Sequence, residues 1–458
     1  MRSSRTKVGA LLCSLMLVFV AVPKQAAAIP YFARKYHTTC SRCHTAFPKL
    51  NVFGRNFQMH GYQQPGDQKV GKISIPEDPN LSVIEQLPVA ILLENRLSLD
   101  KYVSSNSVPA SIDSPTVFHI LAADSIAPDI GIFAELATES GVTDVGKISL
   151  SFNHLLNQNI HFQVGNLDVQ EHGVTEHNLF GGSGFVVQDL DLGGWSASPQ
   201  HQGARIYGLI GSNVTPSLIH GPHATAPASG GDSKESGQNL HGPMVAQSQQ
   251  KQVKEDVMED EVDPMDRLTG YLWEVGVYNG NNSSTAASGS GLSDFSGRVN
   301  AYFLGDSFAG LVGYAGSSTI GGGALNHYQS GGLDFSLMLG KPIERAKGLK
   351  QKPFEIFGNY LAGTASNPFD TGAKVNWHGF FVEGDYLIGT KAIAYLRYDK
   401  VTGNGLETLP ANSGIRPEAV TANFTYYLRT NFYIGAEYTR DMTAANQSGL
   451  GVLFNFAF

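Results

Sequence analysis

Residues 450–458, at the end of the chain, alternate strictly between two kinds of side chain. In an extended strand, successive side chains point to opposite faces, so residues two apart share a face. One face carries Leu450, Val452, Phe454, Phe456 and Phe458, and the other carries Gly451, Leu453, Asn455 and Ala457. A soluble protein gains nothing from such an aromatic face unless another layer covers it. A last strand that ends in Phe is typical of bacterial outer-membrane β-barrels, whose lipid-facing and lumen-facing residues alternate in this way.

The same alternation recurs upstream, in residues 89–100, 376–388, 391–399, 417–428 and 431–439. Charged side chains such as Glu383, Asp385 and Glu437 fall on one face, which we assign to the lumen of a barrel. Only 16% of the residues are charged, whereas about 25% is usual in soluble domains. The chain also has 52 glycines and no long apolar run after residue 30. These features favour an all-β transmembrane β-barrel, with a soluble β-sandwich as the alternative.

The spacing of the alternating segments predicts a barrel of sixteen antiparallel strands within residues 86–458. We expect these strands to start near residues 89, 115, 128, 147, 159, 203, 270, 295, 308, 331, 353, 376, 391, 417, 431 and 448. Connections at 125–127, 305–307, 389–391 and 429–431 are short, whereas those at 101–114, 280–294, 361–375 and 401–416 are long. Outer-membrane barrels have short periplasmic turns and long external loops. An even strand count therefore places both ends of the barrel in the periplasm.

Residues 1–28 have the features of a signal peptide for export. Arg2, Arg5 and Lys7 are followed by the apolar stretch 9–22 and by the small residues 26–28. The segment also contains Lys24. Its removal therefore takes away four positive charges and lowers the formal net charge of the chain from −8 to −12. So acidic a chain argues against nucleic acid as a partner.

Cys40-Ser41-Arg42-Cys43-His44 is the one motif that carries chemistry. Two cysteines three apart followed directly by His are the signature of covalent c-type haem attachment, with His44 as the proximal iron ligand. A zinc site would need two further ligands, and no second CxxC exists. A thioredoxin-like redox pair would need a βαβ setting, which does not follow. The third cysteine, Cys13, lies in the signal peptide, so the exported chain has no other thiol.

Residues 29–85 predict a small cytochrome segment with short helices around 32–39 and 50–59. This stretch resembles the fused monohaem cytochrome–porins of the bacterial outer membrane, whose best-known members are Fe(II) oxidases. The resemblance covers about 35 residues and rests on residues 30–34, 40–44, 47–50 and 53–54. It implies one covalent haem c held by Cys40, Cys43 and His44. So short a segment cannot bury a haem alone, and the barrel lumen is the expected cover.

The sixth haem ligand stays open at this point. Met59 and His60 follow His44 by 15 and 16 residues, far enough to reach the distal face, whereas His37 would need a tight fold. A Met ligand would raise the haem potential and a second His would lower it. The alternatives are a ligand from the barrel or a five-coordinate iron. The basic residues Arg34, Lys35, Arg42, Lys49 and Arg55 either neutralise haem propionates, face an acidic lumen or form a solvated surface.

Residues 213–268 form an insert rich in Pro, Gly, Ser and Gln that has no strand pattern and ends in an acidic run. Its composition is typical of disorder. Strand parity places it on the periplasmic side, where it could dock a basic periplasmic cytochrome or serve only as a solvated linker.

Together these features predict an electron-transfer protein of the bacterial outer membrane. The resemblance implies an extracellular donor, Fe(II) above others, and a periplasmic c-type cytochrome as acceptor, and the chain could then be an Fe(II) oxidase. No Fe(II)-binding constellation is visible in the sequence. The alternatives are a redox conduit that is not specific to iron and a diffusion porin that the haem segment plugs.

Overall fold

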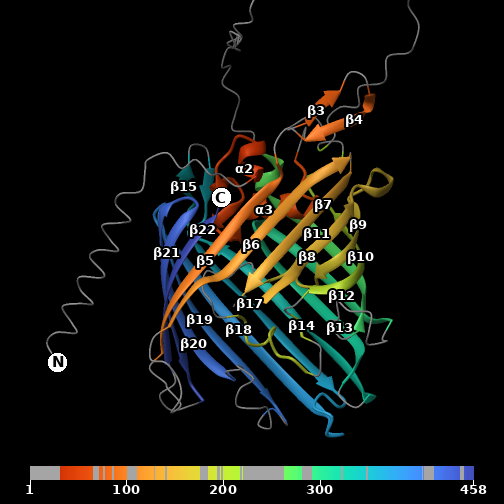
Figure 1. Ribbon diagram of the computed structural model, residues 1–458, viewed down its shortest axis with the longest axis vertical. Helices are drawn as coiled ribbons and strands as arrows, with labels where there is room; N and C mark the ends of the chain where they lie inside the picture. The colour runs from red at the N-terminus through yellow and green to blue at the C-terminus, as the bar shows by residue number, and fades with distance from the viewer. Residues whose placement is uncertain are drawn as a thin grey trace, which may run out of the picture.

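The computed structural model describes a single closed barrel with a small N-terminal segment at one end (Figure 1). The described residues are 31–64, 72–75, 78–84, 87–100, 111–127, 129–139, 142–175, 184–192, 196–197, 200–216, 219, 263–280, 291–320, 323–346, 349–404, 406, 417–443 and 448–457. The predicted signal peptide and most of the predicted insert 213–268 lie outside these residues.

Sixteen antiparallel strands close the barrel, each hydrogen-bonded to its neighbours along the chain, and the last strand pairs with the first. They are β5 (Val89–Asp100), β6 (Ser111–Ala127), β7 (Ile130–Glu139), β8 (Val142–Phe152), β9 (Ile160–Asp168), β10 (Gln200–Ile210), β11 (Leu268–Asn279), β12 (Leu292–Gly305), β13 (Ser307–Thr319), β14 (Leu325–Leu339), β17 (Phe354–Ala365), β18 (Val375–Ile388), β19 (Ala392–Gly403), β20 (Glu418–Arg429), β21 (Phe432–Asp441) and β22 (Ser448–Ala457). The predicted fold class and strand count are therefore confirmed.

The alternation expected from the sequence separates the two faces of the wall. In β22, Gly451, Leu453, Asn455 and Ala457 are buried, whereas Leu450, on the opposite face, is exposed. Charged residues turn inward, as predicted: Glu383, Asp385 and Glu437 are all nearly inaccessible. Large apolar residues such as Phe295, Leu311 and Leu396 are exposed on the outside. A closed barrel with an outward apolar surface belongs in a lipid bilayer, and the chain is an outer-membrane β-barrel. Among the described residues, no helix is long and apolar enough to cross a membrane.

Connections at one end of the barrel are short, as between β12 and β13 or between β20 and β21. The predicted insert joins β10 to β11 and therefore leaves the barrel at this same end. Two small hairpins also lie there, β3 (Lys72–Ile75) with β4 (Asp78–Ile84) and β15 (Ile343–Ala346) with β16 (Leu349–Gln351) (Figure 1). By the rule for outer-membrane barrels, this is the periplasmic end.

The N-terminal segment, residues 31–64, sits in the barrel at the short-turn end, and we call it the plug (Figure 1). It contains α2 (Tyr31–Lys35), a 3-10 turn (Cys40–Arg42), the tiny hairpin β1 (His44–Ala46) with β2 (Lys49–Leu50), and α3 (Val52–Met59). The sequence predicted both helices, but each is shorter than expected. The second begins late because Asn51 is its N-cap and accepts a hydrogen bond from the Gly54 amide.

The connection between β9 and β10 folds into the barrel, which the sequence analysis did not predict. We call its described residues, within 169–197, the inner segment. Phe185 stacks on Phe381 of the barrel wall, with ring centroids 4.0 Å apart, and Arg397 donates to the Gly184 carbonyl at 3.0 Å. Asn326 donates to the Leu192 carbonyl at 2.7 Å. The lumen is therefore occupied at two levels, by the plug and by the inner segment.

Candidate functional site

Buried ion pairs hold the plug in the barrel. Lys49 lies between Asp385 and Glu355, 2.7 Å from the latter carboxylate, and its side chain is only 1% exposed. Burial opposes the charge on Lys49, but the two carboxylates outweigh it and raise the pKa of this lysine. On the opposite wall, Lys35 pairs with Asp124 at 2.8 Å. Of the predicted lumenal carboxylates, Asp385 thus meets the plug, whereas Glu383 and Glu437 pair with Arg397 and Arg96 of the wall.

Asn51 ties the cysteine motif to α3. Its side-chain amide donates to the carbonyl oxygens of Ser41 and Arg42, at 3.1 and 3.0 Å, while its oxygen caps the helix. Gly54 packs against the same turn, because a Cβ at this position would lie 2.1 Å from the Cys43 carbonyl oxygen. The motif and the helix therefore form one rigid unit.

Cys40 and Cys43 are free cysteines on this turn and are partly exposed. Burial raises the pKa of the Cys43 thiol to about 12, so at neutral pH it stays protonated. Between the two cysteines, Arg42 forms ion pairs with Asp263 and Asp266, both at 2.6 Å. These aspartates end the predicted insert, which is thereby fastened to the cysteine motif.

His44 is held in one orientation. Its Nδ1 lies 2.8 Å from the Pro48 carbonyl oxygen, which can only accept, so Nδ1 carries the proton and Nε2 keeps a lone pair. Burial lowers the pKa of His44 to about 4, so the ring is neutral at physiological pH. A neutral imidazole with an oriented Nε2 is the form that ligates a metal.

A narrow cleft with a volume of about 30 Å³ separates the plug from the inner segment. Its lining comprises Leu50, Arg55, Gln58 and Met59 of the plug, Glu171, His172, Gly173 and Thr175 of the inner segment, and Tyr302 and Phe308 of the wall. His44 pairs directly with Leu50 in the β1–β2 hairpin, so both side chains lie on one face of it. The predicted proximal ligand therefore shares a face with a residue of the cleft wall.

The two predicted candidates for the sixth ligand point in different directions. Met59 lines the cleft, and its sulfur accepts a hydrogen bond from the Tyr302 hydroxyl at 3.4 Å. His60 is not part of the lining; its Nδ1 lies 2.8 Å from the Asn56 carbonyl oxygen, and its ring faces His154 and His161 at 6.0 and 5.8 Å. His37 is exposed on the turn after α2. Of the plug residues considered, only Met59 reaches the cleft.

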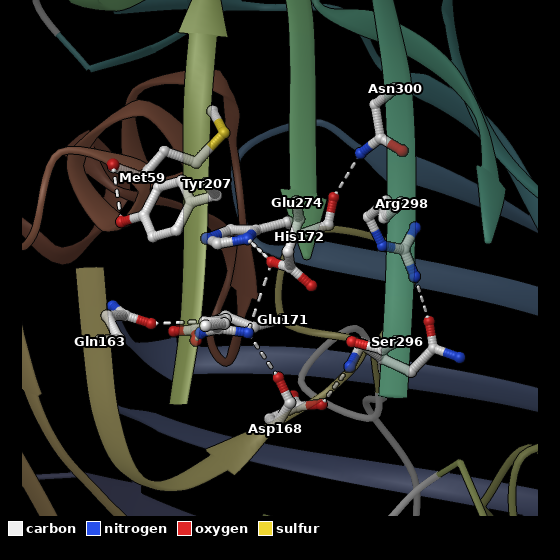
Figure 2. A network of polar contacts seen from close by, with 12 residues as sticks. Met59, Gln163, Asp168, Glu171, His172, Tyr207, Glu274, Ser296, Arg298 and Asn300 are labelled. Atoms are coloured by element: carbon white, nitrogen blue, oxygen red, sulfur yellow. Dashed lines mark hydrogen bonds and ion pairs between the residues drawn. The ribbon is translucent and has the colours of Figure 1, made fainter. Parts of the chain in front are cut away.

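Beyond the cleft, the inner segment joins a buried polar network that the sequence analysis missed (Figure 2). Glu171 pairs with Lys147 and Arg205 and accepts from the Gln58 amide at 3.2 Å. His172 Nδ1 lies 2.5 Å from a Glu274 carboxylate oxygen. No compositional signal marks this segment, since residues 169–192 are no richer in apolar side chains than the chain as a whole.

Among the described residues, no group of three or more His, Cys, Asp or Glu side chains is arranged to hold a metal ion. The basic residues of the plug are largely engaged: Lys35, Arg42 and Lys49 have carboxylate partners, and Arg34 donates to the Val89 carbonyl at 2.9 Å. Arg55 lines the cleft, and its buried Nε has no hydrogen-bond partner in the described part of the chain.

No protein-family model matches the chain, and no curated protein matches it. Several solved structures have a similar chain trace. One is Salmonella typhi OmpF in complex with daunomycin, which is 10% identical in sequence; the superposition covers 81% of this chain and 97% of that chain, with a TM-score of 0.49. An anion-selective porin from Comamonas acidovorans has 10% identity, coverages of 81% and 98%, and a TM-score of 0.49. OmpT of Vibrio cholerae, expressed in the outer membrane, has 12% identity, coverages of 81% and 97%, and a TM-score of 0.45. Likenesses this distant carry no conclusion about activity.

Proposed function

We propose that the protein carries electrons across the outer membrane through one covalently attached c-type haem. The observation that carries this proposal is the arrangement of Cys40, Cys43 and His44: two free thiols on one turn, followed by a neutral imidazole whose Nδ1 is already engaged. When bound, the haem supplies a centre that accepts and releases one electron.

The residues around this motif fit such a group. The cleft beside the hairpin that carries His44 includes Leu50, Met59 and Phe308, although most of its lining residues are polar, and a haem would have to widen it. Arg55 lines the cleft, and its buried Nε has no hydrogen-bond partner among the described residues, so it could donate to a haem propionate. The barrel wall would cover the part of the haem that the short plug could not enclose by itself.

The position of the plug favours a partner on the periplasmic side. It lies at the short-turn end, which is the periplasmic side, and Cys40 is partly exposed there. A soluble periplasmic c-type cytochrome could therefore accept the electron. The donor enters from the side of the long loops, and the resemblance of the motif to Fe(II) oxidases makes Fe(II) the first candidate. One electron leaves Fe(II), which becomes Fe(III), and passes inward.

A diffusion porin is the competing function, because the wall is that of a porin-like barrel. The plug and the inner segment argue against free passage, since Phe185 stacks on Phe381 and Lys49 is locked between two carboxylates. A redox conduit that is not specific to iron is equally compatible with this geometry.

The test is an anaerobic optical spectrum of the purified, oxidised protein before and after addition of Fe(II). Appearance of the sharp α band of reduced c-type haem supports an iron oxidase. If dithionite reduces the haem and Fe(II) does not, the iron assignment is wrong and the unspecific conduit takes its place. The control is the Cys40→Ala/Cys43→Ala variant, which should lack covalent haem. Absence of any haem band from the unaltered protein would refute the proposal altogether.

A further inference from the structure

We propose that Tyr427, a residue of barrel strand β20, is a positioning residue for His44 and thereby lowers the reduction potential of the haem. This inference rests on the proposed function and names a control of that same site. It places one determinant of the potential in the barrel wall, far along the chain from the segment that resembles cytochromes.

The orientation of His44 depends on the turn of its own hairpin. Nδ1 of His44 lies 2.8 Å from the Pro48 carbonyl oxygen, and the Phe47 ring packs beside the imidazole with ring centroids 5.1 Å apart. Both Phe47 and Pro48 belong to the turn between β1 and β2. A displacement of this turn would therefore change the hydrogen bond that holds the imidazole.

The hairpin is too small to fix this turn by itself. β1 has three residues and β2 has two, and their register shifts between His44 and Ala46. An isolated two-stranded hairpin is marginally stable at best in water, even when it is longer than this one. Groups outside the hairpin must therefore hold the turn in place.

Tyr427 makes such a contact at the turn. Its hydroxyl donates to the Phe47 carbonyl oxygen at 2.9 Å, one residue before the carbonyl that faces His44. The Tyr427 side chain is held in turn by the wall, because it is only 8% exposed and its ring centroid lies 5.2 Å from that of Tyr433. The turn is thus tied to a strand of the barrel.

Two other contacts with the barrel hold the strands of the hairpin. The Gln351 amide donates to the Thr45 hydroxyl on β1, and Lys49 on β2 forms the buried ion pairs described above. These contacts keep the hairpin docked as a body. Tyr427 differs from them because it reaches the turn, where the acceptor for His44 lies.

The hydrogen bond of Nδ1 bears on the potential of a haem ligated by His44. An imidazole that donates to a carbonyl is a more basic ligand. A more basic ligand stabilises ferric iron more than ferrous iron, and such hydrogen bonding around the ligand is one of the means by which a protein sets a haem potential. By holding the turn, Tyr427 therefore favours release of the electron to a periplasmic partner.

The experiment measures the reduction potential of the full-length haem protein and of two matched variants, Tyr427→Phe and Tyr433→Phe. Each variant loses one buried hydroxyl, but the Tyr433 hydroxyl accepts a hydrogen bond from Asn455, within the wall. In Tyr427→Phe we expect the preference of the site for ferric over ferrous haem to fall about tenfold, which raises the one-electron potential by about 59 mV. Tyr433→Phe should keep the potential of the unaltered protein.

Hydrogen exchange of the α3 amides is recorded on the same samples. It should be unchanged in Tyr427→Phe, because the ion pairs of Lys49 still dock the plug. Tyr427→Leu removes the hydroxyl with a different apolar side chain and should raise the potential as well, so the test does not depend on the folding of one variant.

An unchanged potential in the Tyr427 variants, or an equal rise in Tyr433→Phe, would overturn the inference. A rise that comes with faster exchange of α3 would overturn it too, since undocking of the plug would then account for the change. In each of these cases the proposed function stands, because covalent haem is present. That function fails separately, if the purified protein contains no covalent haem.

Discussion

Replacing Lys49 by Met should release the plug from the barrel while leaving the barrel wall intact. The lysine is 1% exposed and its two partners, Glu355 and Asp385, are each 4% exposed at the side chain. Removing one partner of a buried ion pair costs about 3–5 kcal/mol, because the remaining charge is buried without compensation. This corresponds to a roughly 150- to 5,000-fold larger equilibrium constant for undocking of the plug.

Hydrogen exchange of the backbone amides in α3, followed in detergent, measures this change, because these amides exchange when the plug undocks. Exchange should accelerate by the same factor, up to the rate of free opening. Lys400→Met is the matched control: Lys400 pairs with Glu418 at 3.2 Å, but the two side chains are 39% and 28% exposed and do not touch the plug, so α3 should be unaffected.

The triple variant Lys49→Met/Glu355→Gln/Asp385→Asn separates charge from packing. It removes all three charges with little change in volume, so part of the protection should return. Unchanged exchange of α3 in Lys49→Met would refute the reasoning, since the ion pairs would then contribute nothing to docking. The reasoning would also be refuted if Lys49→Met and Lys400→Met accelerated the hydrogen exchange of the α3 amides equally.

Three further predictions concern the motif and the lumen. Gly54→Ala should sharply reduce the yield of covalent haem, since the new Cβ meets the carbonyl of the second cysteine at 2.1 Å; Gly297→Ala, whose nearest neighbour would be 4.0 Å away, should not. Asn51→Ala should cost about 1–2 kcal/mol of plug stability, seen as faster exchange in α3, because the helix cap and two further hydrogen bonds are lost. Phe185→Ala should raise single-channel conductance in planar bilayers, because it removes a ring that fills part of the lumen beside Phe381 of the wall; unchanged conductance would mean that other groups close the channel.

The barrel could be predicted because its wall repeats one physical constraint. Each strand contacts lipid on one side and the lumen on the other, so side-chain polarity alternates and reveals the strand. The predicted starts near 89, 203 and 448 lie within a few residues of β5, β10 and β22. The deviations occur at strand ends, as in β8, which begins at Val142 and not near 147, and in β14, which begins at Leu325 and not near 331.

The inner segment could not be predicted, because its surroundings come from distant strands. Phe185 meets Phe381, and His172 meets Glu274, pairs separated by 196 and 102 residues in the sequence. No local periodicity marks such contacts. The choice between Met59 and His60 stays open in the sequence for a related reason. Adjacent helix residues point about 100° apart, so only one can face the cleft, but the sequence does not say which.

The anchors of the plug bear on how the protein is assembled. Tyr31 donates to Asp124 of β6, and Tyr427 of β20 donates to the Phe47 carbonyl, so the plug binds strands near both ends of the barrel sequence. These partners are 93 and 380 residues away from their plug residues. Contacts so distant form only after the intervening chain has been ordered, and the last strand must pair with the first before both walls stand in place. Seating of the plug is therefore expected to be a late event in biogenesis, and until then the barrel does not cover the CxxCH turn.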